Sequence, residues 1–162
     1  MKIGLISDTH DKIQNIRKAV RIFNDKHVDL VIHAGDFVNP IAVESLAGVK
    51  TVGVLGNNDT DIAGLTSTFD KIHGELKGEI FETVYDGLKF ANYHGTNLAK
   101  REQLIKSGKY EVFIYGRNHR KDNRFIGATR IINPSTAKGF FGLFATIAVF
   151  DTSSRKLEFI NL

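Results

Sequence analysis

Residues 1–10 read MKIGLISDTH, and this stretch decides how the rest of the chain is interpreted. An apolar run over residues 3–6 stops at the polar side chains of Asp8 and His10. Such a run predicts a buried strand with a polar C-terminal end, where open α/β sheets carry their chemistry. An aspartate and a histidine two residues apart suit a divalent transition metal. This tripeptide alone leaves a second interpretation open, a solvated loop after a strand.

The composition describes an ordinary globular chain with a modest positive charge. Its 162 residues predict one domain, residues 1–162, and 42% apolar with 25% charged residues is typical of a folded soluble protein. The absence of cysteine excludes disulfides and thiolate ligands, so any metal must use histidine, carboxylate or amide groups. A net charge of +4 is compatible with an anionic ligand. Unless that charge clusters, it does not indicate nucleic-acid binding.

No segment of the sequence predicts export or a membrane span. The apolar run before Asp8 is too short for the core of a signal peptide, and no later stretch approaches the length of a transmembrane helix. We therefore expect a cytoplasmic protein without a membrane partner.

Hydrophobic periodicity predicts strands that alternate with helices in the first half of the chain. A helix over residues 12–26, with Asp11 as a candidate N-cap, is followed by a strand over 29–32, a short helix from Pro40 and a strand over 51–55. This alternation indicates parallel strands with helical crossovers.

The second half of the chain is richer in predicted strands. Asp86 and Gly87 form a strong hairpin signal. The expected strands cover residues 79–85, 88–93, 112–115, 124–128, 129–133, 144–150 and 156–162. A helix is expected over residues 97–107 with its charged residues exposed, and 62–73 is expected to be helical or irregular.

Residues that can bind a metal follow five of the predicted strands. They are Asp8 with His10, Asp36, Asn57, His94 and His119. Chance could supply one or two such endings, but five in one small domain predict a common site.

In this order the motifs D-x-H, G-D, G-N-x-D, H-G and G-x-x-H resemble those of the calcineurin-like metallophosphoesterase superfamily. In length and motif spacing the chain resembles its small single-domain phosphodiesterases of archaea and bacteria, the YfcE-like group. The resemblance covers the whole chain. It implies an α/β (α+β) fold, a two-layer β-sandwich flanked by helices in the αββα architecture. It also implies a metal-dependent phosphoesterase, more specifically a phosphodiesterase, in which a metal-activated water attacks phosphorus.

The resemblance also implies one or two divalent ions, which could be manganese, nickel, iron or zinc. Four side chains would hold the first ion, with the carboxylate of the third bridging both ions: Asp8, His10, Asp36 and His119. Asn57, His94 and the residue at position 117 would belong to the second ion. The implied substrate is a phosphate-ester small molecule or a nucleotide-like compound.

The last motif departs from the family pattern, because residues 116–119 read GRNH in place of G-H-x-H. Arginine stays protonated and has no lone pair for a metal, so Arg117 cannot replace a histidine ligand. Two outcomes remain open. Either a single metal binds and Arg117 contacts the phosphate oxygens of the substrate, or two metals bind weakly and Arg117 is rotated outward.

Two smaller departures lie in neighbouring motifs. Asn58 stands where the superfamily usually has histidine or cysteine, and Thr96 stands where it commonly has histidine. We assign Asn58 a catalytic and substrate-binding role, although an amide donates hydrogen bonds and not a proton. The departures support a second hypothesis, a catalytically impaired fold that acts as a binding or protein-interaction module. A nucleic-acid-binding protein is a third and weaker hypothesis.

Two further questions remain open at the level of sequence. Phe140, Phe141 and Phe144 fit either a substrate wall or an ordinary core or oligomer contact. A homodimer is therefore left open.

Overall fold

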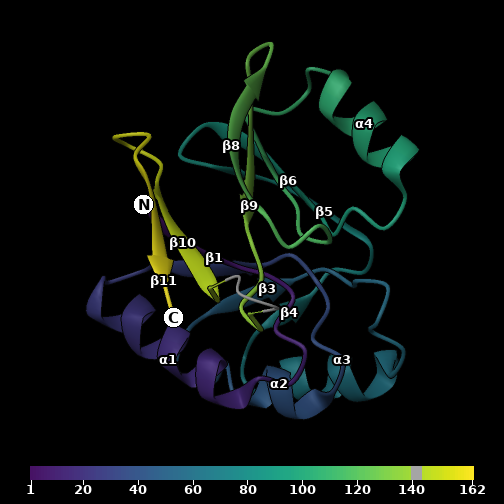
Figure 1. Cartoon of the computed structure of the whole chain (residues 1–162), viewed down its shortest axis with the longest axis vertical. Coiled ribbons are helices and arrows are strands. Elements are labelled where there is room, and N and C mark those ends of the chain that lie inside the picture. Colours follow the sequence, from purple (N-terminus) through teal and green to yellow (C-terminus); the bar gives the residue numbers. More distant parts are fainter. Residues whose placement is uncertain (140–143) are drawn as a thin grey trace.

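Two β-sheets pack face to face, and helices cover the outer face of each (Figure 1). The computed structural model describes residues 1–139 and 144–162. The layered arrangement confirms the predicted two-layer sandwich flanked by helices. Phe140 and Phe141, considered above as a substrate wall, lie outside the described residues, whereas Phe144 is exposed.

The first sheet has six strands and contains the N-terminal strand near its centre. In spatial order they are β11 (Leu157–Asn161), β10 (Thr146–Asp151), β1 (Lys2–Ile6), β2 (Leu30–His33), β3 (Thr51–Gly53) and β4 (Glu75–Leu76). Strands β1 to β4 are parallel to one another, as the alternating pattern predicted, whereas β10 pairs with β1 in the antiparallel direction. Strand β2 is apolar along most of its length because other layers cover both of its faces.

The second sheet has five strands. In spatial order they are β5 (Ile80–Tyr85), β6 (Leu88–Tyr93), β7 (Val112–Ile114), β9 (Thr129–Pro134) and β8 (Lys121–Ile126). The β5–β6 hairpin turns at Asp86 and Gly87, whose φ angles of 48° and 77° are the positive values that a tight two-residue hairpin requires. The hairpin prediction is therefore confirmed.

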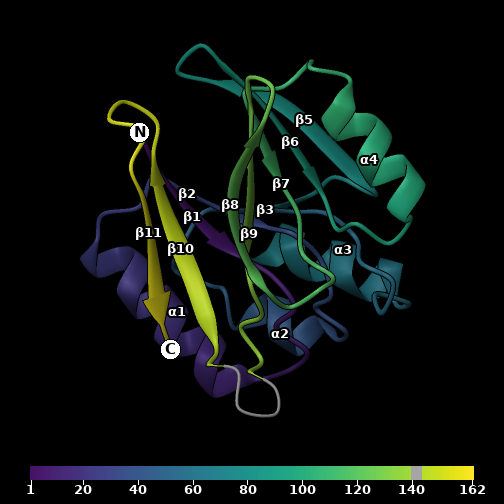
Figure 2. The same cartoon turned by 45° about the horizontal axis from the view of Figure 1, so that its top comes forward.

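Four helices complete the described layers. Helices α1 (Ile13–Asp25), α2 (Pro40–Glu44) and α3 (Ile62–Lys71) lie together against the first sheet, and α4 (Leu98–Lys106) lies beside the second sheet (Figure 2). The apolar face of α1 buries Ile16 and Phe23 against the first sheet, which is the face that the helical periodicity predicted. Buried clusters also fill the space between the sheets and the space under α4.

Several local features differ from the predictions or make them more specific. The N-cap of α1 is Lys12, the neighbour of Asp11, and it makes no side-chain cap, while the Asp11 carboxylate accepts a hydrogen bond from Asn39. Strand β4 was missed because two residues carry no periodicity. Strand β8 begins earlier than expected, at Lys121. The side chain of Arg101 on α4 is only 14% exposed, although the helical pattern placed it on the solvent face.

None of the helices among the described residues is long and apolar enough to cross a membrane.

Candidate metal centre

Side chains from the carboxyl ends of both sheets meet at one edge of the sandwich. Strands β1 and β2 are parallel neighbours in the first sheet, and β6 and β7 are parallel neighbours in the second. The loops that follow these four strands bring together five of the predicted ligands: Asp8, His10, Asp36, His94 and His119.

Asp8, His10 and His119 form the first group with metal-binding geometry. The Nε2 atom of His119 lies 3.0 Å from Oδ1 of Asp8, and Nε2 of His10 lies 3.9 Å from the same oxygen. The three ligand atoms are within 4.8 Å of one another, so one ion could contact all of them. The two histidine rings meet edge to face, with 5.9 Å between their centroids.

Asp8, Asp36 and His94 form a second group, and all three residues are buried. The Nδ1 atom of His94 lies 2.7 Å from the carbonyl oxygen of Ala34, so Nδ1 carries the proton and donates it to that oxygen. The Nε2 atom then presents its lone pair toward Oδ1 of Asp36, 3.5 Å away, without a hydrogen bond. A carbonyl that fixes the tautomer in this way is typical of histidines that bind metals.

The two ligand groups overlap at Asp8, which belongs to both of them. The resemblance implies Asp36 as the bridging carboxylate, and that role stays a prediction. Asp36 also lies between two histidines, with Oδ2 3.4 Å from Nε2 of His10 and Oδ1 3.5 Å from Nε2 of His94. Either carboxylate is therefore placed to contact two ions.

Both carboxyl groups are held ionised in spite of their burial. Burial alone would raise the pKa of Asp8, but its contacts with His10, His119, His94 and Ser7 outweigh burial and hold that pKa well below its usual range. Burial opposes ionisation of Asp36 as well, and its pKa is lowered by contacts with His94 and Asn58. Burial lowers the pKa of His94, but the neighbouring carboxylates of Asp36 and Asp8 reverse the shift and raise it. The edge thus concentrates negative charge that a cation would neutralise.

The backbone at this edge adopts conformations that are rare for side-chain-bearing residues. Positive φ angles of 52°, 39°, 62° and 56° occur at Asp8, His10, Asp36 and His119, and Arg117 has a φ of 72°. Strained backbone concentrates where the surrounding structure holds a functional constellation in place.

Two glycines have no side chain at the positions where the carboxylates lie. A Cβ atom on Gly56 would lie 2.1 Å from Oδ1 of Asp36. A Cβ atom on Gly116 would lie 2.0 Å from Oγ of Ser7 and 2.6 Å from Oδ2 of Asp8. These glycines therefore allow the loops after β3 and β7 to approach the ligands closely.

The asparagine pair after β3 lies next to Asp36. Asn58 donates from its backbone N–H to Oδ1 of Asp36 at 3.0 Å and from Nδ2 to Oδ2 at 2.7 Å. Asn57 is exposed, and the hydrogen bonds of the described residues include none from its side chain. Asn57 therefore stays a predicted ligand of the second ion.

Arg117 contributes its backbone and not its side chain to the cluster. Its N–H donates to Oδ2 of Asp8 at 3.2 Å, and its residue surface is exposed. Thr96 is exposed as well.

Several residues that support the site carry little signal in the sequence. Asp59 accepts hydrogen bonds from the backbone N–H groups of Asp36, Val38 and Gly56 at 2.7–2.8 Å, so it joins the loops after β2 and β3. Ser7 donates to Oδ2 of Asp8 at 2.5 Å. The G-N-x-D motif pointed to Asp59, whereas nothing in the sequence distinguishes Ser7.

His33 is a buried core histidine with hydrogen-bond partners at both ring nitrogens. Its Nδ1 accepts from the N–H of Gly35 at 3.1 Å, so Nε2 carries the proton that points to Oγ1 of Thr9, 3.2 Å away. The ring stacks on Phe37 with 3.8 Å between centroids.

The residues present fit a divalent metal. The Nε2 atoms of His10 and His94 are buried and have no hydrogen-bond partner among the described residues. An unpaired buried nitrogen costs free energy that a metal–ligand bond would recover. The donors are imidazole nitrogens and carboxylate oxygens, the set that suits manganese, iron, nickel and zinc.

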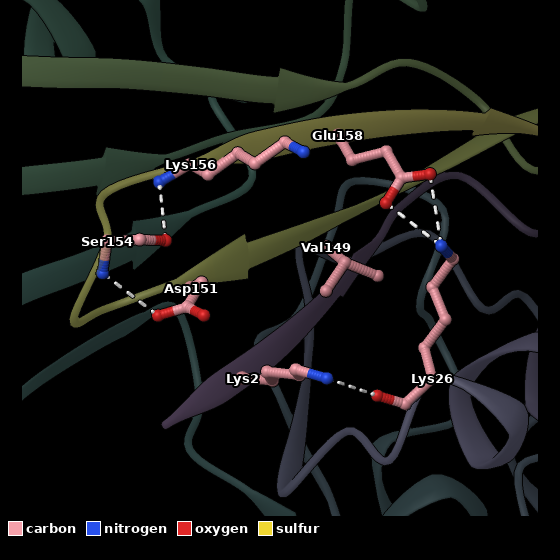
Figure 3. Close-up of a pocket in the computed structure, with 7 residues that line it drawn as sticks. All are labelled: Lys2, Lys26, Val149, Asp151, Ser154, Lys156 and Glu158. Atoms are coloured by element: carbon pink, nitrogen blue, oxygen red, sulfur yellow. Dashed lines mark hydrogen bonds and ion pairs between the residues drawn. The ribbon is translucent and has the colours of Figure 1, made fainter.

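A pocket at the opposite end of β1 does not share this chemistry (Figure 3). It is lined by Lys2 and by residues of β10, β11 and the turn between them. Lys26 is already engaged in a two-oxygen ion pair with Glu158, and Lys2 donates to the carbonyl of Lys26. These solvent-exposed lysines are satisfied by the chain itself.

A family comparison covers nearly the whole chain. Residues 1–155 match the model of the calcineurin-like phosphoesterase superfamily domain. A phosphodiesterase of Methanocaldococcus jannaschii is 36% identical over 165 residues, which cover 100% of this chain and 99% of that protein.

Solved structures give the same picture of the fold. A structure described as a novel archaeal phosphodiesterase superimposes with a TM-score of 0.92 at 36% identity and covers 100% of both chains. YfcE, a phosphoesterase from E. coli, superimposes with a TM-score of 0.71 at 17% identity and covers 99% of each chain. The second likeness concerns the fold alone.

Proposed function

Because the chain belongs to the calcineurin-like phosphoesterase superfamily, we propose that it is a metal-dependent phosphodiesterase. The observation that carries this proposal is the pair of three-residue ligand groups that share Asp8. The implied substrate is a small phosphate diester or a nucleotide-like compound, as in relatives named phosphodiesterase.

The proposed ligands are Asp8, His10, Asp36, His94 and His119, with Asn57 at the second ion. A bound divalent ion would supply a water of lowered pKa and positive charge for the phosphoryl oxygens. The chain's own part is to hold the site ready. Ser7 and the Arg117 N–H orient the Asp8 carboxylate, the Ala34 carbonyl orients His94, and Asn58 holds Asp36.

The side chain of Asn58 predicts how turnover depends on the leaving group. Its amide lies at the site and can donate a hydrogen bond to a departing oxygen, but it cannot transfer a proton. We therefore expect turnover to fall steeply as the pKa of the leaving alcohol rises. A series of aryl phosphodiesters measured with manganese should show this slope, and Asn58→His should flatten it. Equal rates across the series in the parent protein would contradict this role.

The presence of Arg117 bears directly on how many metal ions bind to each chain. Its guanidinium stays protonated and offers no lone pair, and the residue stands at the position that the resemblance assigns to the second ion. We expect one tightly bound ion per chain by elemental analysis after mild purification, and a second only at high metal concentration. Arg117→His should raise the stoichiometry toward two. Two tightly bound ions in the parent protein would mean that Arg117 is turned away.

The decisive assay uses purified protein with added manganese or nickel on a generic aryl phosphodiester. Asp8→Asn should abolish turnover because it removes charge from both ligand groups. Lys106→Met, an exposed change in the last turn of α4, is the matched control and should keep the parent rate. Turnover at the buffer rate with every metal tried would overturn the enzymatic proposal.

The second candidate is a binding or protein-interaction module, which Arg117, Asn58 and Thr96 favour. The double variant Arg117→His with Asn58→His separates the two functions. A large gain in turnover would mean that the natural site is impaired. Unchanged, measurable turnover in both proteins would favour the enzyme.

The cytoplasmic location and the homodimer stay predictions. Binding of nucleic acid remains the weakest candidate. An affinity for nucleic acid that does not fall as the salt concentration rises would exclude it.

A further inference from the structure

Arg101 of α4 is a mostly buried guanidinium with little to neutralise it. Its side chain is 14% exposed, and its Nε–H is buried without a hydrogen-bond partner among the described residues. Its one acidic contact is Oε1 of the adjacent Glu102 at 3.5 Å, the outer limit of a hydrogen bond. Burying a charge costs free energy unless an opposite charge and hydrogen bonds offset the lost hydration. The described surroundings of Arg101 therefore lack a close anion.

The position of Arg101 places that charge beside the candidate metal centre. Gly95 directly follows His94, and a Cβ atom on Gly95 would lie 3.4 Å from Cδ of Arg101 and 3.6 Å from Cβ of Arg117. Both arginines therefore border the same backbone position, next to a ligand. Among the described residues, no ion pair involves Arg117. The stems of both side chains meet at Gly95, so an anion bound beside this residue lies within the reach of both guanidinium groups.

The surface beneath Arg101 is held in place. The Arg101 guanidinium lies over the ring of Tyr115, 4.9 Å from its centroid. The Tyr115 hydroxyl donates to Oδ2 of Asp122 at 2.9 Å and accepts from Asn118 at 3.3 Å. Asn133 fixes the same loop by donating to the Gly116 carbonyl at 2.8 Å. A stacked guanidinium on a fixed ring loses little further freedom when it binds, which favours recognition of an oxyanion.

We propose that Arg101 and Arg117 form an anion subsite at Gly95 that binds a second negatively charged group of the substrate, a phosphate or a carboxylate beyond the scissile phosphoryl group. This inference rests on the proposed function and names its substrate class: diesters that carry an additional oxyanion. Arg101 sets specificity, and the ligand groups that share Asp8 act on the ester.

The first test compares two substrates that differ by one phosphate group. They are the p-nitrophenyl ester of thymidine 5′-phosphate with and without a 3′-phosphate. Arg101→Met keeps the apolar stem and removes the charge. It should raise KM for the substrate with the 3′-phosphate about tenfold, the loss of one charge-assisted contact, with kcat unchanged and with the substrate that lacks the 3′-phosphate little affected. Arg101→Lys should recover part of the loss, and Lys106→Met should change neither substrate.

The second test needs no turnover. Calorimetry with pyrophosphate on metal-stripped protein should show binding that Arg101→Met weakens about tenfold and Lys106→Met leaves alone. Binding that depends on Arg101 in a protein without turnover would keep the subsite and reject the phosphodiesterase. Turnover with equal effects of Arg101→Met on both substrates, or no pyrophosphate binding by the parent protein, would overturn the subsite and leave the proposed function standing.

Discussion

His33 shows how a single buried side chain supports the site without binding a metal. Its unprotonated Nδ1 holds the N–H of Gly35, which begins the loop that carries Asp36. Burial lowers the pKa of His33 to about 3, from an ordinary value of 6.5. The fold therefore needs this imidazole neutral.

Stability should depend on pH through His33. Between pH 6.5 and about 3 the unfolded chain binds a proton at this residue that the folded chain does not bind, so this contribution is complete above pH 6.5 and is lost as the pH falls. One proton corresponds to a slope of up to about 1.4 kcal/mol per pH unit. His33→Asn, whose amide oxygen can still accept from Gly35 but does not titrate, should lack this slope.

Urea unfolding of both proteins at pH 4, 5, 6 and 7 measures the difference. Asp8 and Asp36 titrate in both proteins, so subtracting the two curves isolates His33. If the free energy of unfolding depends on pH in the same way in both proteins, the burial of His33 does not couple folding to proton binding.

At the scale of elements, the loops after β3 and β7 approach the ligands closely because their glycines carry no side chain. The loop after β7 reaches Asp8 over a separation of more than a hundred residues, through the Arg117 N–H and the His119 ring. Asn133 in β9 and Ser135 directly after β9 hold that loop by hydrogen bonds to the carbonyl groups of Gly116 and His119. A loop held from both sides cannot shift to admit a new atom.

Gly116→Ala should therefore displace Asp8. The added Cβ would meet the Ser7 hydroxyl and the Asp8 carboxylate, and we expect a loss of about 1–3 kcal/mol in stability with a strong loss of manganese affinity. Gly127→Ala is the control, because its Cβ meets nothing within 4 Å although its φ is +57°. The control should cost about 1 kcal/mol and leave manganese affinity unchanged. Titration calorimetry and thermal melting measure both effects, and equal manganese affinities would contradict the role of Gly116.

At the scale of the whole molecule, one apolar layer joins the two sheets. It contains Leu5 and Ile32 of the first sheet together with Phe90 and Ile114 of the second. Because both sheets supply ligands, the site exists only when this layer is packed.

Phe90→Ala should weaken the entire domain. The ring is 1% exposed and meets Tyr85 and Phe150 edge to face, so its loss should cost about 3–5 kcal/mol. Urea unfolding followed by far-UV circular dichroism and by tyrosine fluorescence should give one coincident transition in both the parent and the variant. Separate transitions for the two signals would contradict the prediction of a single domain.

Much of the fold could be predicted because its signals are local. Apolar runs of strand length, the helical spacing of residues 12–26 and the Asp86–Gly87 turn depend on neighbours in the chain, and the structure confirms them in type if not in every boundary. The order of polar residues after the strands predicted which loops meet, because parallel strands end at the same edge.

Only the tertiary structure decided how those residues share the site. The sequence could not show that Asp8 belongs to both ligand groups, that Asn58 and not Asn57 contacts Asp36, or that Arg101 lies over Tyr115. Each of these depends on side-chain directions and on contacts between residues distant in the chain, set by sheet packing and by positive φ angles. Residues 1–10 by themselves left a loop and a site equally open, the five strand endings together predicted a site after β1, and the packing of the second sheet against the first determined its geometry.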